Sequence, residues 1–320
     1  MDSRAIYQQV SDRYSATARA ETSTHHVETV ARAFGYSTRE LASTPSESNL
    51  GLSCGNPLAL ANLQGKETVI DLGCGAGFDV FLAAKKLEKG GKVIGVDMNG
   101  DMLAKAAQCA SKTNATNLHF LNSRVTAINL PNESADVVIS NCVINLIPDA
   151  EKHLVFKEVY RLLKPGGRLA VSDILTKQPL PEYMKQNVAL YVGCLAGASS
   201  KEEYENWLQD AGFDDIVILD AGNDLNVYTS GQVNAGCCSG AGDQKAESPQ
   251  MCCGGNDSDG GVLTDMKRDL RNLDLNEWAG SFKIFAVKRV WDGEGNILEL
   301  DDPPPSSLEQ AMMVAMEMTD

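Results

Sequence analysis

The pattern of apolar and polar positions along this 320-residue chain alternates between short apolar runs and longer amphipathic stretches. Seven runs have the length and character of strands: 69–72, 92–97, 118–121, 135–140, 168–174, 216–219 and 281–289. Most stretches between them carry apolar residues at helical spacing. The run at 135–140 is a largely apolar strand, typical of a parallel sheet buried on both faces. The pattern therefore predicts an α/β fold with a doubly wound, mostly parallel, seven-stranded sheet.

The regions outside the sheet indicate additions at both ends. Amphipathic stretches at 3–20 and near 26–34 predict an N-terminal helical cap, and Asn56 followed by Pro57 predicts a helix start just after Cys54. Residues 234–262 are mostly small and polar, too poor in apolar side chains to form a core. We therefore divide the chain into the cap (1–65), a cofactor-binding domain (66–222), a Cys-rich, partly flexible insertion (223–280), the final strand (281–290) and an acidic tail (291–320).

One segment joins a strand, a glycine turn and a helix. Residues 69–79 read Val-Ile-Asp-Leu-Gly-Cys-Gly-Ala-Gly-Phe-Asp, and the next strand closes with Asp97. Glycines let the backbone approach a ligand closely, and an acidic residue at the end of the second strand can accept both hydroxyls of a ribose. No Gly-Lys-Ser or Gly-Lys-Thr follows, so a phosphate loop is not indicated. NAD remains an alternative cofactor at this point.

Composition narrows the class of partner. A formal charge of −15 and a pI near 4.7 argue against binding to a nucleic-acid backbone or an anionic membrane surface. The N-terminus lacks the charged and apolar regions of a signal peptide, so we expect a cytoplasmic protein. In that compartment the nine cysteines are expected to be mostly reduced, which favours metal-like or catalytic roles over disulfides.

The glycine segment resembles that of the class I S-adenosylmethionine (SAM) methyltransferases. The resemblance implies that Asp71 and the glycines hold the methionine part, Asp97 the ribose and Met98 the adenine, with the loop 123–126 beside the adenine. The cofactor-binding residues expected on this basis are Asp71, Gly73, Cys74, Gly75, Gly77, Asp97, Met98, Val125, Thr126 and Asn141. We interpret the thiols of Cys74 and Cys109 as packing groups.

The end of the fourth strand indicates the substrate. Methyltransferases of amino nitrogen often carry Asn/Asp-Pro-Pro-Tyr there, whereas this chain has Ser-Asn-Cys-Val-Ile-Asn at 140–145. A soft thiol replaces a carbonyl and aromatic platform, which argues against an amine. No obvious His or Glu base stands at the strand ends.

Residues 30–220 resemble the arsenite methyltransferases. The specific segments are Ser-Asn-Leu-Gly-Leu-Ser-Cys-Gly-Asn-Pro at 48–57, Ser-Asn-Cys-Val-Ile-Asn-Leu at 140–146 and Val-Gly-Cys-Leu-Ala-Gly at 192–197. The resemblance implies that Cys54, Cys142 and Cys194 bind trivalent arsenic and are the catalytic residues. Two cysteine pairs also occur in that family, and we expect an auxiliary role for Cys237, Cys238, Cys252 and Cys253. The family's additional N-terminal cysteine is absent, because no cysteine precedes Cys54.

The implied activity is methylation of arsenite and methylarsenite, with SAM as cofactor and a thiol reductant (glutathione or thioredoxin) as co-substrate. Trivalent arsenic is soft and prefers thiolates. We expect arsenic detoxification by a monomer that binds neither nucleic acid nor membrane. Two alternatives stay open: methylation of carbon or oxygen in a small molecule such as a quinone, and metalloid sequestration by a protein without activity.

Overall fold

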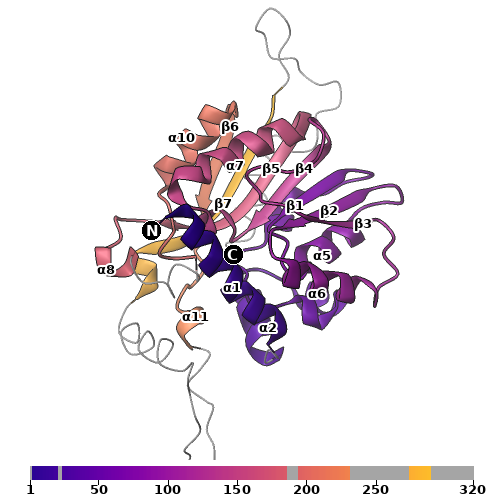
Figure 1. The fold of residues 1–320 in the computed structure, drawn as a ribbon, viewed down its shortest axis with the longest axis horizontal. Helices are drawn as coiled ribbons and strands as arrows, with labels where there is room; N and C mark the ends of the chain where they lie inside the picture. The colour runs from indigo at the N-terminus through magenta and orange to yellow at the C-terminus, as the bar shows by residue number, and fades with distance from the viewer. Residues whose placement is uncertain (1, 21–23, 186–193, 231–273, 290–320) are drawn as a thin grey trace, which may run out of the picture.

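The computed structural model describes residues 2–20, 24–185, 194–230 and 274–289. They form a seven-stranded sheet with helices on both sides (Figure 1). The strand order is β3-β2-β1-β4-β5-β7-β6, and every pair is parallel except those that β7 makes with β5 and β6. The predicted doubly wound, mostly parallel sheet is therefore confirmed.

The strands lie close to the predicted apolar runs. Their bounds are β1 Thr68–Leu72, β2 Lys92–Asp97, β3 Leu118–Asn122, β4 Ala135–Asn141, β5 Leu163–Thr176, β6 Asp215–Asp220 and β7 Ala279–Val287. The carboxyl ends of β1, β2 and β4 are in register, with Leu72 opposite both Val96 and Ser140. This register brings the glycine turn, Asp97 and Cys142 to one edge of the sheet.

The helices pack on the two faces of the sheet and over its carboxyl edge. Their bounds are α1 Ser3–Arg19, α2 Thr24–Ala33, α3 Thr38–Ser43, α4 Pro57–Ala61, α5 Phe78–Lys86, α6 Gly100–Ala110, α7 Asp149–Leu162, α8 Glu182–Lys185, α10 Lys201–Ala211 and α11 Val227–Ser230. Short 3-10 turns span Ser46–Ser48, Ile144–Leu146 and Leu275–Glu277. The Asn56 side chain accepts a hydrogen bond from the Ala59 N–H at 3.3 Å, so the predicted cap of α4 is confirmed.

Alternate residues of the central strands bury into opposite cores. On β1, Ile70 and Leu72 pack in the core beneath α7 and α10, while Val69 packs with the α4 and α5 side. On β4, Val138 faces the first core and Val137 the second. All five side chains are at most 1% exposed, as expected where both faces of a parallel sheet are covered.

The two described ends of the predicted insertion are packed rather than loose. Leu225 and Leu275 are buried, and the rings of Tyr228 and Phe34 stack with their centroids 5.2 Å apart. Strand β7 begins at Ala279, two residues earlier than predicted. The paired cysteines and the acidic tail lie outside the described residues. Helix α8 ends at Lys185, where the described residues break off until Cys194. Among the described residues, no helix has the length and hydropathy that would let it cross a membrane.

Candidate functional site

The glycine turn after β1 takes the conformation that its sequence requires. Gly73, Gly75 and Gly77 all have positive φ, at 63°, 52° and 88°. A Cβ on Gly73 would lie 2.4 Å from the Val143 side chain, so no larger residue fits against the end of β4. Asp97 closes the turn, because its two carboxylate oxygens accept the N–H groups of Gly75 and Asn99, each at 2.8 Å.

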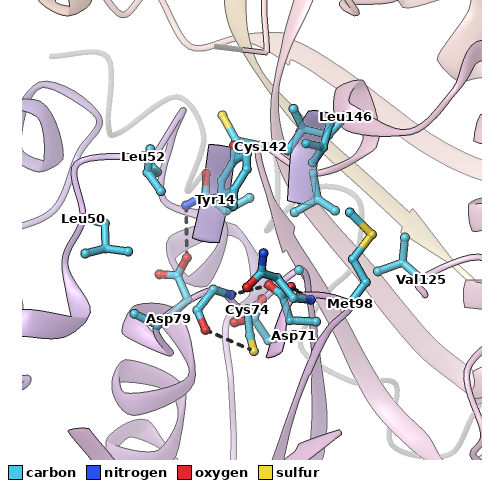
Figure 2. A pocket seen from close by; sticks show the side chains of 18 of the residues that line it. Tyr14, Leu50, Leu52, Asp71, Cys74, Asp79, Met98, Val125, Cys142 and Leu146 are labelled. Atoms are coloured by element: carbon cyan, nitrogen blue, oxygen red, sulfur yellow. Dashed lines mark hydrogen bonds between the residues drawn. The ribbon is translucent and has the colours of Figure 1, made fainter. Parts of the chain in front are cut away.

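A pocket opens between this turn, β2, β4 and helix α1 (Figure 2). Eight of the ten predicted cofactor-binding residues line it: Asp71, Gly73, Cys74, Gly75, Asp97, Met98, Val125 and Asn141. Gly77 and Thr126 do not line it, and Gly77 instead begins α5. The pocket also reaches Cys142, so the cofactor region and the cysteine region share one space.

Three carboxylates gather in this pocket, and the electrostatics indicate the charge of its ligand. Burial raises the pKa of Asp71 well above its usual value, and the charges of Asp79 and Asp97 raise it further. Burial also raises the pKa of Asp79 to about 6 and raises that of Asp97. None of the three forms an ion pair with a Lys or Arg among the described residues. A cationic ligand would compensate this charge, and SAM carries positive charge on its ammonium and sulfonium groups.

Helix α1 covers the pocket and is held in place by hydrogen bonds to the elements around it. The Asn99 side chain donates hydrogen bonds to the Ser11 carbonyl at 2.8 Å and to the Ser15 hydroxyl at 2.9 Å. At the other end of the helix, the Tyr7 hydroxyl donates to Glu151 at 2.8 Å. Tyr14, on the same helix, also lines the pocket, and its hydroxyl lowers the pKa of the Cys194 thiol against the larger effect of burial.

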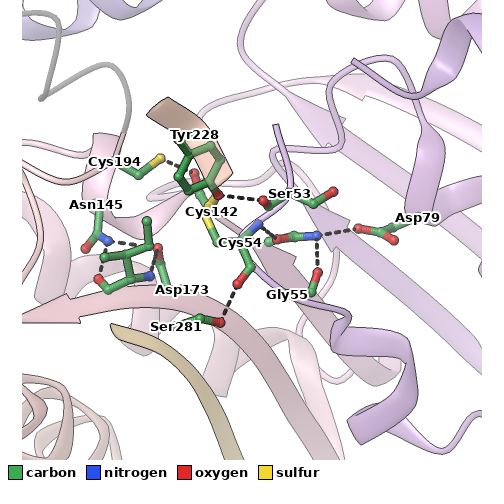
Figure 3. Close-up of a disulfide and its surroundings, with 12 residues drawn as sticks. Ser53, Cys54, Gly55, Asp79, Cys142, Asn145, Asp173, Cys194, Tyr228 and Ser281 are labelled. Carbon is green, nitrogen blue, oxygen red and sulfur yellow. Dashed lines mark hydrogen bonds between the residues drawn. A yellow bond between two sulfur atoms is a disulfide. The ribbon is translucent and has the colours of Figure 1, made fainter. Parts of the chain in front are cut away.

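The fold brings together the three cysteines that the sequence selected. The sulfur atoms of Cys54, Cys142 and Cys194 lie within 4.8 Å of one another (Figure 3). Their side chains are 1%, 4% and 4% exposed and belong to an apolar cluster. Thiols held this close in a dry environment suit a soft ion with three ligands.

The structure brings the sulfurs of Cys54 and Cys142 within bonding reach, with Cα atoms 5.6 Å apart as in a disulfide, and leaves Cys194 free. The sequence analysis expected mostly reduced cysteines, and Cys74, Cys109 and Cys194 are free thiols. Cysteines that converge on one ligand also come within bonding reach of each other. Sequence separation of 88 residues gave no indication of the pairing.

The backbone directs two of the cysteines in an unusual way. Cys142 and Cys194 have φ of 59° and 66°, in the left-handed region that non-glycine residues rarely adopt. Such conformations cluster at functional sites, where the surrounding structure holds them. Here the Cys142 N–H donates to the Ser172 carbonyl at 2.9 Å, and the Cys194 thiol donates to the Cys142 carbonyl at 3.2 Å.

Buried polar groups hold the segment that carries Cys194. The Lys152 ammonium, 1% exposed, donates to the Gly197 carbonyl at 2.6 Å and to the Ser199 hydroxyl at 3.0 Å. Nearby, Asp173 accepts hydrogen bonds from Asn145 at 2.8 Å and from Tyr204 at 2.9 Å. Burial raises the pKa of Asp173 to about 6, and burial together with the Asp173 charge raises the pKa of Cys194.

The remaining described cysteines fit the packing interpretation. Cys74 and Cys109 are buried and free, and burial raises the pKa of each thiol. A Cβ on Gly95 would lie 2.8 Å from the Cys74 sulfur, which shows how tightly that thiol packs on β2.

Among the pocket-lining residues that sequence reasoning missed are Tyr7, Tyr14 and Asp79. Asp79 stands in the first turn after the glycines, which is a signal that could have been used. The two tyrosines lie seven residues apart on α1, and that spacing alone predicts only a helix face.

The comparisons with known proteins agree with this geometry. A family model described as a methyltransferase domain matches residues 63–212. That match covers slightly less than half of the chain. Over 184 residues the chain is 44% identical to an arsenite methyltransferase of Halobacterium salinarum. The matched segment covers 58% of this chain and 46% of that protein. The human arsenite methyltransferase is 35% identical over 154 residues, 45% of this chain and 40% of that protein. The matched part of the chain is thus similar in sequence to arsenite methyltransferases, and it spans less than half the length of each of these relatives.

The solved structures support the fold. A Haemonchus contortus phosphoethanolamine N-methyltransferase 2 in complex with S-adenosyl-L-methionine superimposes with a TM-score of 0.56 at 19% identity. The match covers 84% of this chain and 58% of that one. Together with the strand order, this likeness identifies the fold as that of the class I SAM methyltransferases.

Proposed function

We propose that this protein methylates trivalent arsenic, with arsenite and then methylarsenite as substrates and SAM as the methyl donor. The observation that carries the proposal is the cluster of three buried cysteine sulfurs within 4.8 Å at a pocket that also contains the glycine turn and Asp97. Cys142 belongs to both, because it lines the pocket and contributes one of the three sulfurs.

The residues of the pocket fit SAM. Asp97 offers remaining lone pairs to the ribose hydroxyls, the turn at 73–77 leaves room beside the methionine part, and Asp71 balances positive charge. Bound there, SAM supplies a methyl group on a positively charged sulfur. Helix α1 covers part of this space and the apolar cluster surrounds the cysteines, an arrangement that favours exclusion of water during transfer.

The cysteines bind the substrate by exchange. Three thiols replace the three hydroxyls of arsenite, and each thiol proton leaves with one hydroxyl as water, so no separate base is required. Arsenic bound in this way keeps its lone pair, which is the nucleophile for the methyl group. Catalysis is then mostly positioning and exclusion of water.

The same chemistry calls for a thiol reductant such as glutathione or thioredoxin. Cys54 and Cys142 are close enough to be oxidised to a disulfide, so a reductant is needed to keep both as thiols for three ligands to be available. Methyl transfer also uses the arsenic lone pair and raises the formal oxidation state by two electrons. These electrons must be returned by thiols before a second round.

The experiment is incubation of the purified protein with SAM, arsenite and glutathione, followed by separation of arsenic species. We expect methylated arsenic that requires all three components. Methyl transfer to a quinone but not to arsenite would replace the proposal with the small-molecule alternative. Tight arsenite binding without methylated product would replace it with sequestration.

A further inference from the structure

Asn141 was expected to bind the cofactor, but its side chain contacts the segment that carries Cys54. Its Oδ1 accepts the Cys54 N–H at 3.1 Å, and its Nδ2 donates to the Gly55 carbonyl at 3.0 Å. One side chain at the end of β4 thus bonds the backbone on both sides of the Cys54 carbonyl, 87 residues away in sequence.

Neighbouring groups fix the orientation of the Asn141 amide. Its Nδ2 also lies 2.9 Å from the Tyr36 hydroxyl and 3.0 Å from Asp79 Oδ2. The Tyr36 hydroxyl in turn donates to Asp79 Oδ1 at 2.7 Å. With only acceptors around the nitrogen, the amide oxygen must point to the Cys54 N–H, so the amide cannot flip without losing these bonds.

Two further bonds hold the same segment from other elements. The Ser281 hydroxyl on β7 donates to the Cys54 carbonyl, and the Tyr228 hydroxyl on α11 donates to the Ser53 carbonyl at 2.7 Å (Figure 3). Of these contacts, the two from Asn141 come from the strand end that also carries Cys142. Cys142 therefore supplies one thiol of the site, and its neighbour Asn141 supplies the amide that holds the backbone of Cys54, the second thiol.

We propose that Asn141 is a positioning residue that sets Cys54 against Cys142, and that its main role is assembly of the thiol site rather than binding of the cofactor. This role deepens the proposed function, since it rests on Cys54 and Cys142 being two of the three arsenic ligands. The physical claim concerns the distance between two thiols, so it can be measured without arsenic and without methyl transfer.

The test is the equilibrium between the two thiols and glutathione. One oxidised glutathione takes two electrons and two protons from Cys54 and Cys142, which gives the protein disulfide and two reduced glutathione molecules. The equilibrium constant reports how well the fold holds the two thiols together. It is measured in the full chain by mass spectrometry of the Cys54–Cys142 peptide pair, and SAM affinity is measured by calorimetry on the same samples.

We expect Asn141→Ala to lower this constant about tenfold, the effect of two lost neutral hydrogen bonds, with SAM affinity close to that of the unsubstituted chain. Asn141→Asp is isosteric and keeps the acceptor for the Cys54 N–H, but it sets a carboxylate oxygen against the Gly55 carbonyl and Asp79, so we expect a decrease at least as large. The matched control is Asn122→Ala at the end of β3, where the side chain donates only to the carbonyls of Asp97 and Met98, and the constant should not change.

Two outcomes would overturn the proposal. An unchanged equilibrium constant in both Asn141 variants would show that the amide does not place Cys54. A large loss of SAM affinity with an unchanged constant would return Asn141 to the cofactor site. Neither result bears on whether arsenite is methylated, so failure of this inference and failure of the proposed function remain distinct.

Discussion

Asp97 offers a quantitative test of the cofactor site. Its carboxylate accepts two backbone N–H groups of the glycine turn and the following loop, at 2.8 Å each, and has lone pairs left for a ribose. Asp97→Ala removes the ribose acceptor and loosens the turn. A hydrogen bond to a charged group is worth about 1.5–3 kcal/mol, so the dissociation constant for SAM should rise roughly tenfold to 150-fold.

The assay for this substitution is calorimetric titration of SAM into each variant, with thermal unfolding of the free protein as a check on folding. The matched control is Asp101→Ala. Asp101 is close in sequence, its side chain is 43% exposed, and it forms a surface ion pair with Arg19, which contributes little. SAM affinity should be nearly unchanged in the control. Equal affinity in the Asp97 variant and the unsubstituted chain would refute the assignment of this strand end to the ribose.

Two further predictions concern the thiol site. Methylarsenite has only two exchangeable positions, so Cys54→Ser should lose methylation of arsenite but keep some methylation of methylarsenite, whereas Cys142→Ser and Cys194→Ser should lose both. Arsenite methylation at full rate in any of the three would contradict the model of three ligands. Tyr14→Phe removes the hydroxyl that favours the Cys194 thiolate and should slow arsenite methylation about threefold to tenfold, measured at saturating SAM; an unchanged rate would show that this hydroxyl is not used.

Much of the sheet could be predicted because its signals are local. The second strand has the predicted bounds, 92–97, since an apolar run between turn residues defines it. The fifth strand starts at Leu163, five residues earlier than predicted. Pro165 and the two glycines after it are residues that usually interrupt a strand, but Leu163 pairs with Ala135 across a register shift, a contact that local sequence does not encode.

The sequence predicted which cysteines form the site, but not how they are arranged in space. The three cysteines were selected by resemblance, and the fold places their sulfurs together. The pairing of Cys54 with Cys142 and the role of Asn141 depend on where the N-terminal cap meets β4. Those contacts span more than 80 residues, so they follow from tertiary structure and leave no periodic pattern in the sequence.

The central claim is that one arsenic atom binds to three sulfurs at the edge of the SAM pocket. X-ray absorption at the arsenic edge, on the reduced protein loaded with one equivalent of arsenite, counts the neighbours of arsenic directly. The account predicts three sulfur neighbours and no oxygen, falling to two sulfurs in Cys54→Ser. A shell dominated by oxygen, or a spectrum unchanged by Cys54→Ser, would contradict it.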